Sequence, residues 1–479
     1  MTPNVPLLAW VPDSDPTVPG VIIDVEQLLP TARGYAPERA LSASSWDYGA
    51  VPAAICGAAL LHFSEANSTI FAGTTTDLYN FAASAVNDVS SGTYAAGVGP
   101  STPWRFASFG NVALAAHGSN VLQAKSAPDT ATAFVAVSGG PKAATICVQS
   151  NFVMLGETTE SSWSYGDGYW CSALGDHTNW TPDPATQCEQ GRLTQTPGPI
   201  VRMIAFGADV IAFKRTSMLR GRYIGDVSGG AIWDWKVVSR SIGIVAHDAV
   251  CEAGGVLYWL SDSGFYQFNG GNAQRINDAP FDWMVRSMTD QWVYLIPYVQ
   301  AQWDRVRRLV RWYYPLVSGF SSLDGGVALH PDTGRWGRFS VAATWALNTF
   351  SDSVYRPTNP DAKLEYVVPA VFTTSNRVRI LAGSPVASTI TTGDVGDDDI
   401  ATAMTRVRAR FVSAPTISTL THYYRSVLSD SLTTGVTQSR TDGRYDISHG
   451  ARWHRFKLSQ TGNYELLGFS VAPASRAKR

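Results

Sequence analysis

Residues 243–276, GIVAHDAVCEAGGVLYWLSDSGFYQFNGGNAQRI, decide the fold. Runs of β-branched and aromatic residues alternate here with three turn signals, Gly254-Gly255, Asp262-Ser263-Gly264 and Gly270-Gly271. Short runs of this kind, bounded by turn-forming residues, are typical of strands in an antiparallel meander. The last run is polar, so the unit passes from a buried strand to an exposed one. We therefore predict a small four-stranded sheet.

Similar units precede and follow this one. They are expected at 53–82, 104–126, 143–180, 198–239, 292–341 and 363–383. Repeats of roughly 40–50 residues, each a small meander, are typical of a β-propeller, because one such sheet cannot bury both of its faces alone. The sequence thus predicts an all-β protein with a β-propeller at 46–384. Seven blades are favoured, and six or eight remain open because the units differ in length.

Two regions lie outside the repeats. Residues 1–45 contain seven prolines and are expected to form an extended N-terminal arm that needs a partner surface. Residues 385–400 include three successive aspartates and are expected to form a polar linker. Residues 401–479 contain several strand-like runs, which predict a small C-terminal β-sandwich-like domain.

Composition narrows the class of protein. Charged residues make up 16% of the chain, against roughly 25% in ordinary soluble domains, which favours a surface partly covered by other subunits. The net charge is −2, so the chain lacks the strongly basic character of proteins that wrap DNA. The five cysteines are scattered without a C-x-x-C pair, so we expect reduced, buried thiols. Neither a signal peptide nor a membrane-spanning segment is predicted.

The aspartates of three fragments are candidates for a structural role. The fragments SYGDGYW (164–170), SDSGFYQF (261–268) and PDTGRWGRF (331–339) resemble the Asp-box turn of sialidase blades. We expect Asp167, Asp262 and Asp332 to cap backbone N–H groups in turns, with the following aromatic residue packed between blades. No spacing indicates catalytic, metal-binding or cofactor-binding residues, so we expect no enzymatic activity, no metal and no cofactor.

Two clusters of arginine are the one charge pattern that indicates a possible contact surface. The first cluster lies in WDRVRRLVRWYY (303–314), the second in TRVRARF (405–411). Alternation in the second run predicts three guanidinium groups on one face of a strand. Either cluster could be a solvated or subunit-contacting face, or could contact phosphate or an acidic partner. The arginines concerned are Arg305, Arg307, Arg308 and Arg311 in the first cluster and Arg406, Arg408 and Arg410 in the second.

The order of several fragments resembles the tail nozzle family of short-tailed bacteriophages, also called tail tubular protein B or packaged-DNA stabilisation protein. The fragments span nearly the whole chain. They are DVEQLLPTARGYAPE (24–38), WRFASFGNVALAAHGSN (104–120), PKAATICVQSNFVMLGE (141–157), SYGDGYWCSALGDHTNW (164–180), GPIVRMIAFGADVIAFKRTSMLRGRYIG (198–225), VLYWLSDSGFYQFNGG (256–271) and WHRFKLSQTGNYELLGFSVAP (453–473).

This resemblance implies a structural virion protein, assembled in the host cytoplasm. The chain would form a homohexameric ring that continues the DNA exit channel below the portal and adaptor. Its partners would be copies of itself, the adaptor ring, tail fibre, tailspike or tail-tip proteins, and double-stranded DNA that passes without sequence-specific binding. Two alternatives remain open: a propeller enzyme acting on glycans, and a glycan- or protein-binding module. Acidic and arginine residues converging at the central mouth of the propeller would favour the enzyme.

Overall fold

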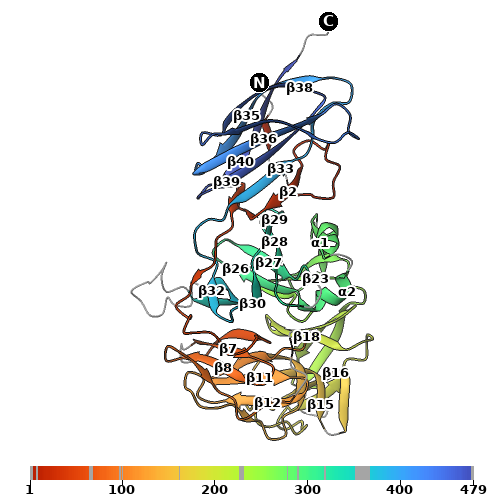
Figure 1. Ribbon diagram of the computed structural model, residues 1–479. Coiled ribbons are helices and arrows are strands. Elements are labelled where there is room, and N and C mark those ends of the chain that lie inside the picture. Colours follow the sequence, from red (N-terminus) through yellow and green to blue (C-terminus); the bar gives the residue numbers. More distant parts are fainter. Residues whose placement is uncertain are drawn as a thin grey trace.

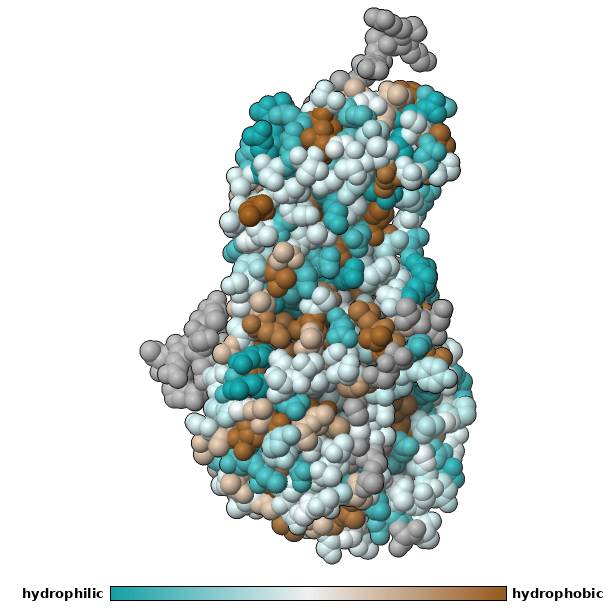
Figure 2. All heavy atoms as spheres, viewed as in Figure 1, coloured by the Kyte–Doolittle hydropathy of each residue, from teal (hydrophilic) through white to brown (hydrophobic). Residues whose placement is uncertain are grey.

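The computed structural model describes residues 4–6, 9–63, 68–95, 99, 101–160, 162–225, 231–277, 279–288, 291–317, 320–350 and 367–475. These residues form two β-rich bodies, a propeller and a C-terminal sandwich, stacked along one long axis (Figure 1). The surface narrows between the two bodies, and on the face in view apolar residues are interspersed with polar ones (Figure 2).

Within the described ranges the propeller comprises seven antiparallel blades. Blade 1 holds β6 (Ala58–His62), β7 (Ser68–Gly73), β8 (Leu78–Ala82) and β9 (Ala85–Asp88). Blade 2 holds β10 (Arg105–Phe109), β11 (Val112–His117), β12 (Asn120–Lys125) and β13 (Val135–Ala136). Blade 3 holds β14 (Lys142–Gln149), β15 (Phe152–Glu160), β16 (Trp163–Cys171) and β17 (Glu189–Arg192). Blade 4 holds β18 (Ile200–Phe206), β19 (Asp209–Lys214), β20 (Met218–Tyr223) and β21 (Trp233–Ser239).

The remaining blades complete the circle. Blade 5 holds β22 (Val250–Ala253), β23 (Val256–Ser261), β24 (Gly264–Phe268) and β25 (Gln274–Arg275). Blade 6 holds β26 (Gln300–Asp304), β27 (Leu309–Tyr314), β28 (Gly325–His330) and β29 (Arg335–Phe339). Blade 7 holds β30 (Ala343–Phe350), β31 (Val367–Thr373), β32 (Val378–Ile380) and, as its outer strand, β5 (Ser42–Ala43). The propeller fold and the favoured number of seven blades are confirmed.

The propeller ring closes because blade 7 contains strands from both the N-terminal and the C-terminal side of the propeller. β5 comes from the N-terminal arm and pairs with β32, while the inner strand β30 contacts β6 of blade 1. Aromatic residues fill the spaces between blades. Phe265 of blade 5 lies 4.6 Å from Trp312 and 4.7 Å from Trp336 of blade 6, measured between ring centroids. This confirms that the aromatic residue after the Asp262 turn packs between blades.

The N-terminal arm finds its partner surface within the same chain. β1 (Asn4–Pro6) and β2 (Ile22–Glu26) join the two sheets of the C-terminal sandwich. β3 (Leu28–Pro30) and β4 (Tyr35–Pro37) form a hairpin between β29 of blade 6 and β40 of the sandwich. One continuous sheet therefore runs from blade 6 into the sandwich through the arm. The arm is a set of strands that joins both bodies, not a free extension.

The sandwich is larger than predicted because the segment 385–400 belongs to it. Its strands are β33 (Ser388–Thr392), β34 (Val395–Gly396), β35 (Thr402–Phe411), β36 (Ile417–Arg425), β37 (Thr433–Ser439), β38 (Arg444–Ala451), β39 (Trp453–Thr461) and β40 (Leu466–Ser475). One sheet has the order β40-β35-β38 and the other β2-β33-β39-β36-β37. β33 buries Ser388, Ile390 and Thr392. The prediction of a polar linker over 385–400 is therefore wrong, because hydroxyl side chains hid a strand.

A short helical insertion separates blades 5 and 6. It comprises α1 (Phe281–Ser287), α2 (Trp292–Leu295) and the 3-10 helix η1 (Ile296–Tyr298). The unit predicted at 292–341 was expected to begin with a strand at VYLIPYV (293–299), and this is wrong, because the first strand of blade 6 begins only at Gln300. Leu295, Ile296 and Val299 are buried while Val293 and Tyr294 are exposed, a spacing that suits one face of a helix. No helix among the described residues has the length and apolarity needed to cross a bilayer.

Close contact between the arm and the sandwich makes Gly34 sensitive to substitution. A Cβ at this position would lie 2.0 Å from the backbone oxygen of Leu466 in β40. We expect Gly34→Ala to lower the free energy of unfolding by about 1–3 kcal/mol, because the strands must separate to admit the methyl group. Urea denaturation measures the change. In Gly271→Ala, the matched control, the nearest atom is a side-chain oxygen at 3.5 Å, and an equal loss there would contradict the prediction.

Candidate functional site

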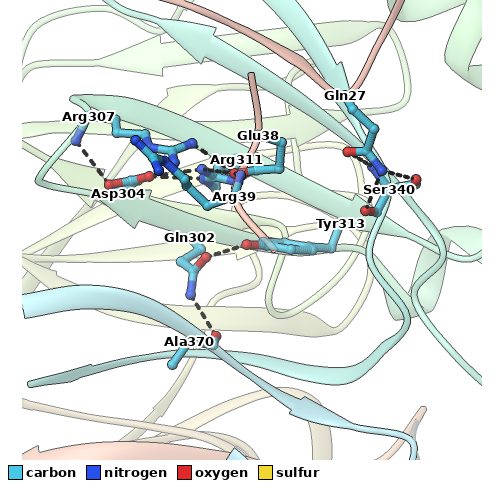
Figure 3. A network of polar contacts seen from close by, with 10 residues as sticks. All are labelled: Gln27, Glu38, Arg39, Gln302, Asp304, Arg307, Arg311, Tyr313, Ser340 and Ala370. Carbon is cyan, nitrogen blue, oxygen red and sulfur yellow. Dashed lines mark hydrogen bonds and ion pairs between the residues drawn. The ribbon is translucent and has the colours of Figure 1, made fainter. Parts of the chain in front are cut away.

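The first arginine cluster is engaged inside the chain. Arg311 in β27 is fully buried and pairs with Glu38 of the arm and with Asp304 at the end of β26 (Figure 3). Arg307 Nη1 lies 2.8 Å from Glu38 Oε1, and Arg308 pairs with Asp332 at the surface. Arg305 is exposed. The acidic partner of Arg307 and Arg311 is thus the chain's own arm, and for Arg307, Arg308 and Arg311 the prediction of an external contact is corrected.

This buried network holds the arm on blade 6. Burial raises the pKa of Glu38, but the positive charges of Arg311 and Arg307 outweigh it and hold the pKa below its usual value. The same pairing raises the pKa of Arg311 against the effect of burial. Gln302 extends the polar contacts to blade 7 by donating to the carbonyl oxygens of Leu347 and Ala370. The cluster therefore fastens the arm and two blades together.

The second arginine cluster remains available at the surface. Arg406, Arg408 and Arg410 of β35 are all exposed, whereas the alternate residues Val407 and Ala409 are buried. The predicted alternation is confirmed. The three side chains lie on the outer face of the sandwich sheet β40-β35-β38.

These arginines line a groove of about 620 Å³, here called the arginine groove. Its residues are Arg406, Arg408, Ala409, Arg410, Phe411, Val412, Ala414, Thr441, Asp442, Arg444, Ser470 and Ala472. Arg408 lies directly opposite Arg444 of β38, so two like charges face each other across the ladder, an unfavourable arrangement. Arg406 Nε donates to Asp446 Oδ1 at 3.1 Å, which lowers the pKa of Asp446. Arg408 and Arg410 have no ion pair among the described residues.

The three candidate aspartates bind arginine side chains. Asp167 lies within strand β16 rather than in a turn, and its carboxylate accepts from Arg192 at 2.8 Å. Asp262 lies in the turn before β24 and pairs with Arg215 of blade 4, while Asp332 lies in the turn before β29 and pairs with Arg308. The turn position is correct for Asp262 and Asp332 and wrong for Asp167. Ion pairs with neighbouring strands or blades replace the expected backbone caps.

A second polar site lies in the hub of the propeller. The hub cavity, of about 390 Å³, is lined by residues of, or adjoining, all seven inner strands. Arg105 Nη1 of β10 lies 2.5 Å from Asp248 Oδ2, next to β22, and Arg202 of β18 lies 3.9 Å from the other carboxylate oxygen. His247 accompanies them, with its Nδ1 atom 2.9 Å from Asp248 Oδ1. Two guanidinium groups thus converge on one carboxylate.

The hub carries an excess positive charge. Burial lowers the pKa of His247 well below its usual value, and the charges of Arg105 and Arg202 add to this effect, so the imidazole is neutral. Burial also lowers the pKa of Arg105, to about 10, although Asp248 opposes the shift. Both arginines stay charged near neutral pH. The Nε atoms of Arg105 and Arg202 are buried without a hydrogen-bond partner among the described residues.

Comparison with known proteins assigns no function to this chain. No protein-family model matches the sequence, and no curated protein matches it. Among solved structures, the chain is similar to an exo-beta-1,3-galactanase from Phanerochaete chrysosporium, with 10% identity, 91% of this chain and 99% of that chain covered, and a TM-score of 0.31. It is also similar to YCF48 from Cyanidioschyzon merolae (9% identity, 70% and 98% covered, TM-score 0.37). A third is Hsv2 from Kluyveromyces lactis (8% identity, 72% and 95% covered, TM-score 0.36).

One of these similarities corrects an expectation from the sequence. We expected no enzymatic activity, because no catalytic spacing was found. A protein named as an enzyme, the galactanase, stands among these similar structures, and a fold by itself gives no ground for excluding catalysis. The expectation is withdrawn on this finding, and at 10% identity the similarity assigns no activity to this chain.

The hub cluster carries no sequence signal. Arg105, Arg202 and Asp248 come from three different blades and meet only because the inner strands surround one axis. Arg105 and Arg202 lie within inner strands and Asp248 lies two residues before one, without a fixed spacing between the three.

Proposed function

We propose that this chain is a structural virion protein, a subunit of a homohexameric tail nozzle ring of a short-tailed bacteriophage. The ring would continue the DNA exit channel below the portal and adaptor, retain packaged DNA and dock tail fibres, tailspikes or a tail tip. The observation that carries the proposal is the order of family-like fragments along nearly the whole chain, from 24–38 to 453–473.

The positions of these fragments in the fold support the proposal. The fragment 24–38 includes β3 and β4, which connect blade 6 to the sandwich, and 453–473 includes β39 and most of β40. The fragments between them fall in blades 2 to 5. The resemblance therefore covers both bodies and their junction, as expected if the whole architecture is shared rather than one blade.

The charge of the chain also fits a channel through which DNA moves. Each additional phosphate contact strengthens binding to DNA, so a protein past which DNA must slide should present few free cations. The net charge is −2, and Arg307, Arg308 and Arg311 are neutralised by acidic partners within the chain. This combination favours passage of DNA over tight binding.

Localisation on the particle tests the proposal. The chain, carrying a C-terminal tag, is produced in the phage that encodes it, and purified particles are labelled with gold particles against the tag. We expect label at the tail, and particles made without the protein should lose packaged DNA. Particles that carry no label, or that keep their DNA without the protein, would contradict the proposal.

The hub cluster favours a second candidate function, binding of an acidic glycan. Arg105 and Arg202 both line this polar cavity, and guanidinium groups bind carboxylates through paired hydrogen bonds. A uronic acid or a similar sugar acid is the matching ligand. Asp248 is the one carboxylate among the described residues that line the hub cavity, whereas glycosidases commonly use two.

Calorimetric titration with uronic-acid oligosaccharides tests this second candidate. We expect Arg202→Ala to weaken binding at least tenfold, because it removes one of the two converging cations. The exposed Arg305 provides a control, and Arg305→Ala should leave affinity unchanged. Absence of binding by the unmodified protein at millimolar ligand would exclude this candidate, and release of shortened sugars during the titration would show hydrolysis.

A further inference from the structure

We infer that the arginine groove of one subunit binds the acidic turn Asp397–Asp399 of a second copy of this chain, head to tail. The inference rests on the proposed function, since it names the contact that would build the proposed ring. It is carried by two surfaces of opposite charge on the sandwich, one concave and one an exposed turn.

The groove is built to receive carboxylates. Its lining includes the small residues Ser470 and Ala472 of β40, which lie directly opposite Arg408 and Arg406 on the neighbouring strand. Arg408 faces Arg444 across the ladder, and this repulsion would be relieved by an anion between the two side chains. Asp442 and Asp446 offset only part of the charge of the four arginines. The groove therefore has two positive charges in excess and donors suited to carboxylate oxygens.

The acidic turn is held in a fixed conformation between β34 and β35. Asp397 Oδ1 accepts hydrogen bonds from the backbone N–H groups of Asp399 and Ile400, at 2.8 and 3.2 Å. Asp398 Oδ1 accepts from Trp453 Nε1 at 3.1 Å. The carboxylate of Asp399 has no partner among the described residues. A rigid, exposed turn loses little conformational entropy on binding, which favours its use as a contact.

The two surfaces lie toward opposite ends of the same strand. The turn precedes Thr402, at the start of β35, while the groove surrounds Arg406 to Arg410, near its end. At about 3.3 Å per residue, Asp399 and Arg408 are separated by roughly 30 Å along the strand. One subunit therefore cannot satisfy its own groove. A contact between two different patches on identical subunits is head to tail, and rings are built from such contacts when the rotation closes.

Charge reversal with rescue tests the contact. The mass of the native assembly is measured for the unmodified protein, for Arg408→Asp, for Asp399→Arg and for the two changes combined. Each single reversal should weaken association at least tenfold, since like charges then meet, and the double variant should recover assembly. Raising the salt concentration should also weaken association of the unmodified protein.

The controls separate this contact from the proposed function. Arg305→Asp reverses an exposed charge on the propeller and should leave assembly unchanged. If the unmodified protein forms a ring and both single reversals still form it, or if the control breaks it as readily, the contact is wrong while the nozzle proposal stands. If the unmodified protein forms no ring, either alone or mixed with the adaptor ring, the proposed function fails with it. Both residues are exposed, so the variants should fold, and circular dichroism of each variant checks this.

Discussion

Glu38→Ala is expected to lower the free energy of unfolding by about 3–5 kcal/mol, the cost of removing one partner from a buried ion pair. Glu38 is 1% exposed and neutralises Arg311, which is fully buried, together with Arg307 (Figure 3). Without Glu38, the guanidinium group of Arg311 keeps only Asp304 as an ion-pair partner, and that of Arg307 loses its ion pair. The substitution also frees the arm from blade 6, so β5 is held less firmly in blade 7.

The measurement is the urea midpoint of the variant, with Asp332→Ala as the matched control. Asp332 also pairs with an arginine of blade 6, but both side chains are at least half exposed, and such surface pairs contribute about 0–1 kcal/mol. We expect the two variants to differ by at least about 2 kcal/mol on this reasoning. Equal midpoints would show that the buried network does not hold the arm in place.

The second large expected effect is that lowering the pH decreases the folding stability of the sandwich. His422 in β36 and His454 in β39 are fully buried and stacked, with His422 Nε2 at 2.9 Å from His454 Nδ1. Burial, together with the neighbouring His454 and His449, lowers the pKa of His422 to about 4. His422 therefore takes up a proton near pH 6.5 in the unfolded chain but only near pH 4 in the folded chain. Its contribution to folding stability is complete above pH 6.5 and is lost as the pH falls from 6.5 toward 4.

The hydrogen-bond network explains why both rings must be neutral. His454 Nε2 donates toward the carbonyl oxygens of Thr402 and Ala451, which leaves its Nδ1 as an acceptor for His422 Nε2–H. His422 Nδ1 is then an unprotonated nitrogen, buried without a hydrogen-bond partner in the described part of the chain. A proton on that atom would find no acceptor, and one on His454 Nδ1 would face the N–H of His422.

Urea denaturation at pH 7 and pH 5 measures this dependence. By pH 5, His422 should contribute a loss of about 2 kcal/mol, from the difference between its folded and unfolded pKa values. In His422→Phe, which keeps a ring stacked on Phe456, the loss between the two pH values should be smaller by that amount. An unchanged pH dependence in His422→Phe would mean that His422 is protonated in the folded state.

Turns and strand faces depend on residues close together in the sequence, so local patterns predicted them correctly. Gly254-Gly255 and the turn at Asp262 mark hairpins because turn chemistry acts over a few residues. The alternation of Arg406, Arg408 and Arg410 correctly assigned one exposed face, since side chains on a strand alternate wherever the strand lies.

Contacts between distant segments were not accessible in the same way. Glu38 and Arg311 are separated by 273 residues, and no spacing rule links an arm to a blade. The sequence of β33 suggests a linker because Ser388 and Thr392 are polar, although the strand pairs with β2 and β39 and buries both side chains. The ion pair in the hub could not be predicted for the same reason as that of Glu38, because Arg105 and Asp248 become neighbours only after the ring closes.

The central claim is that this chain assembles as a nozzle ring, and native mass spectrometry of the purified protein, alone and mixed with the adaptor ring of the same particle, tests it most directly. The account predicts a species of six subunits of 51.7 kDa each, formed alone or on the adaptor. A chain that remains a monomer in both conditions, at concentrations well above those in an infected cell, would contradict it.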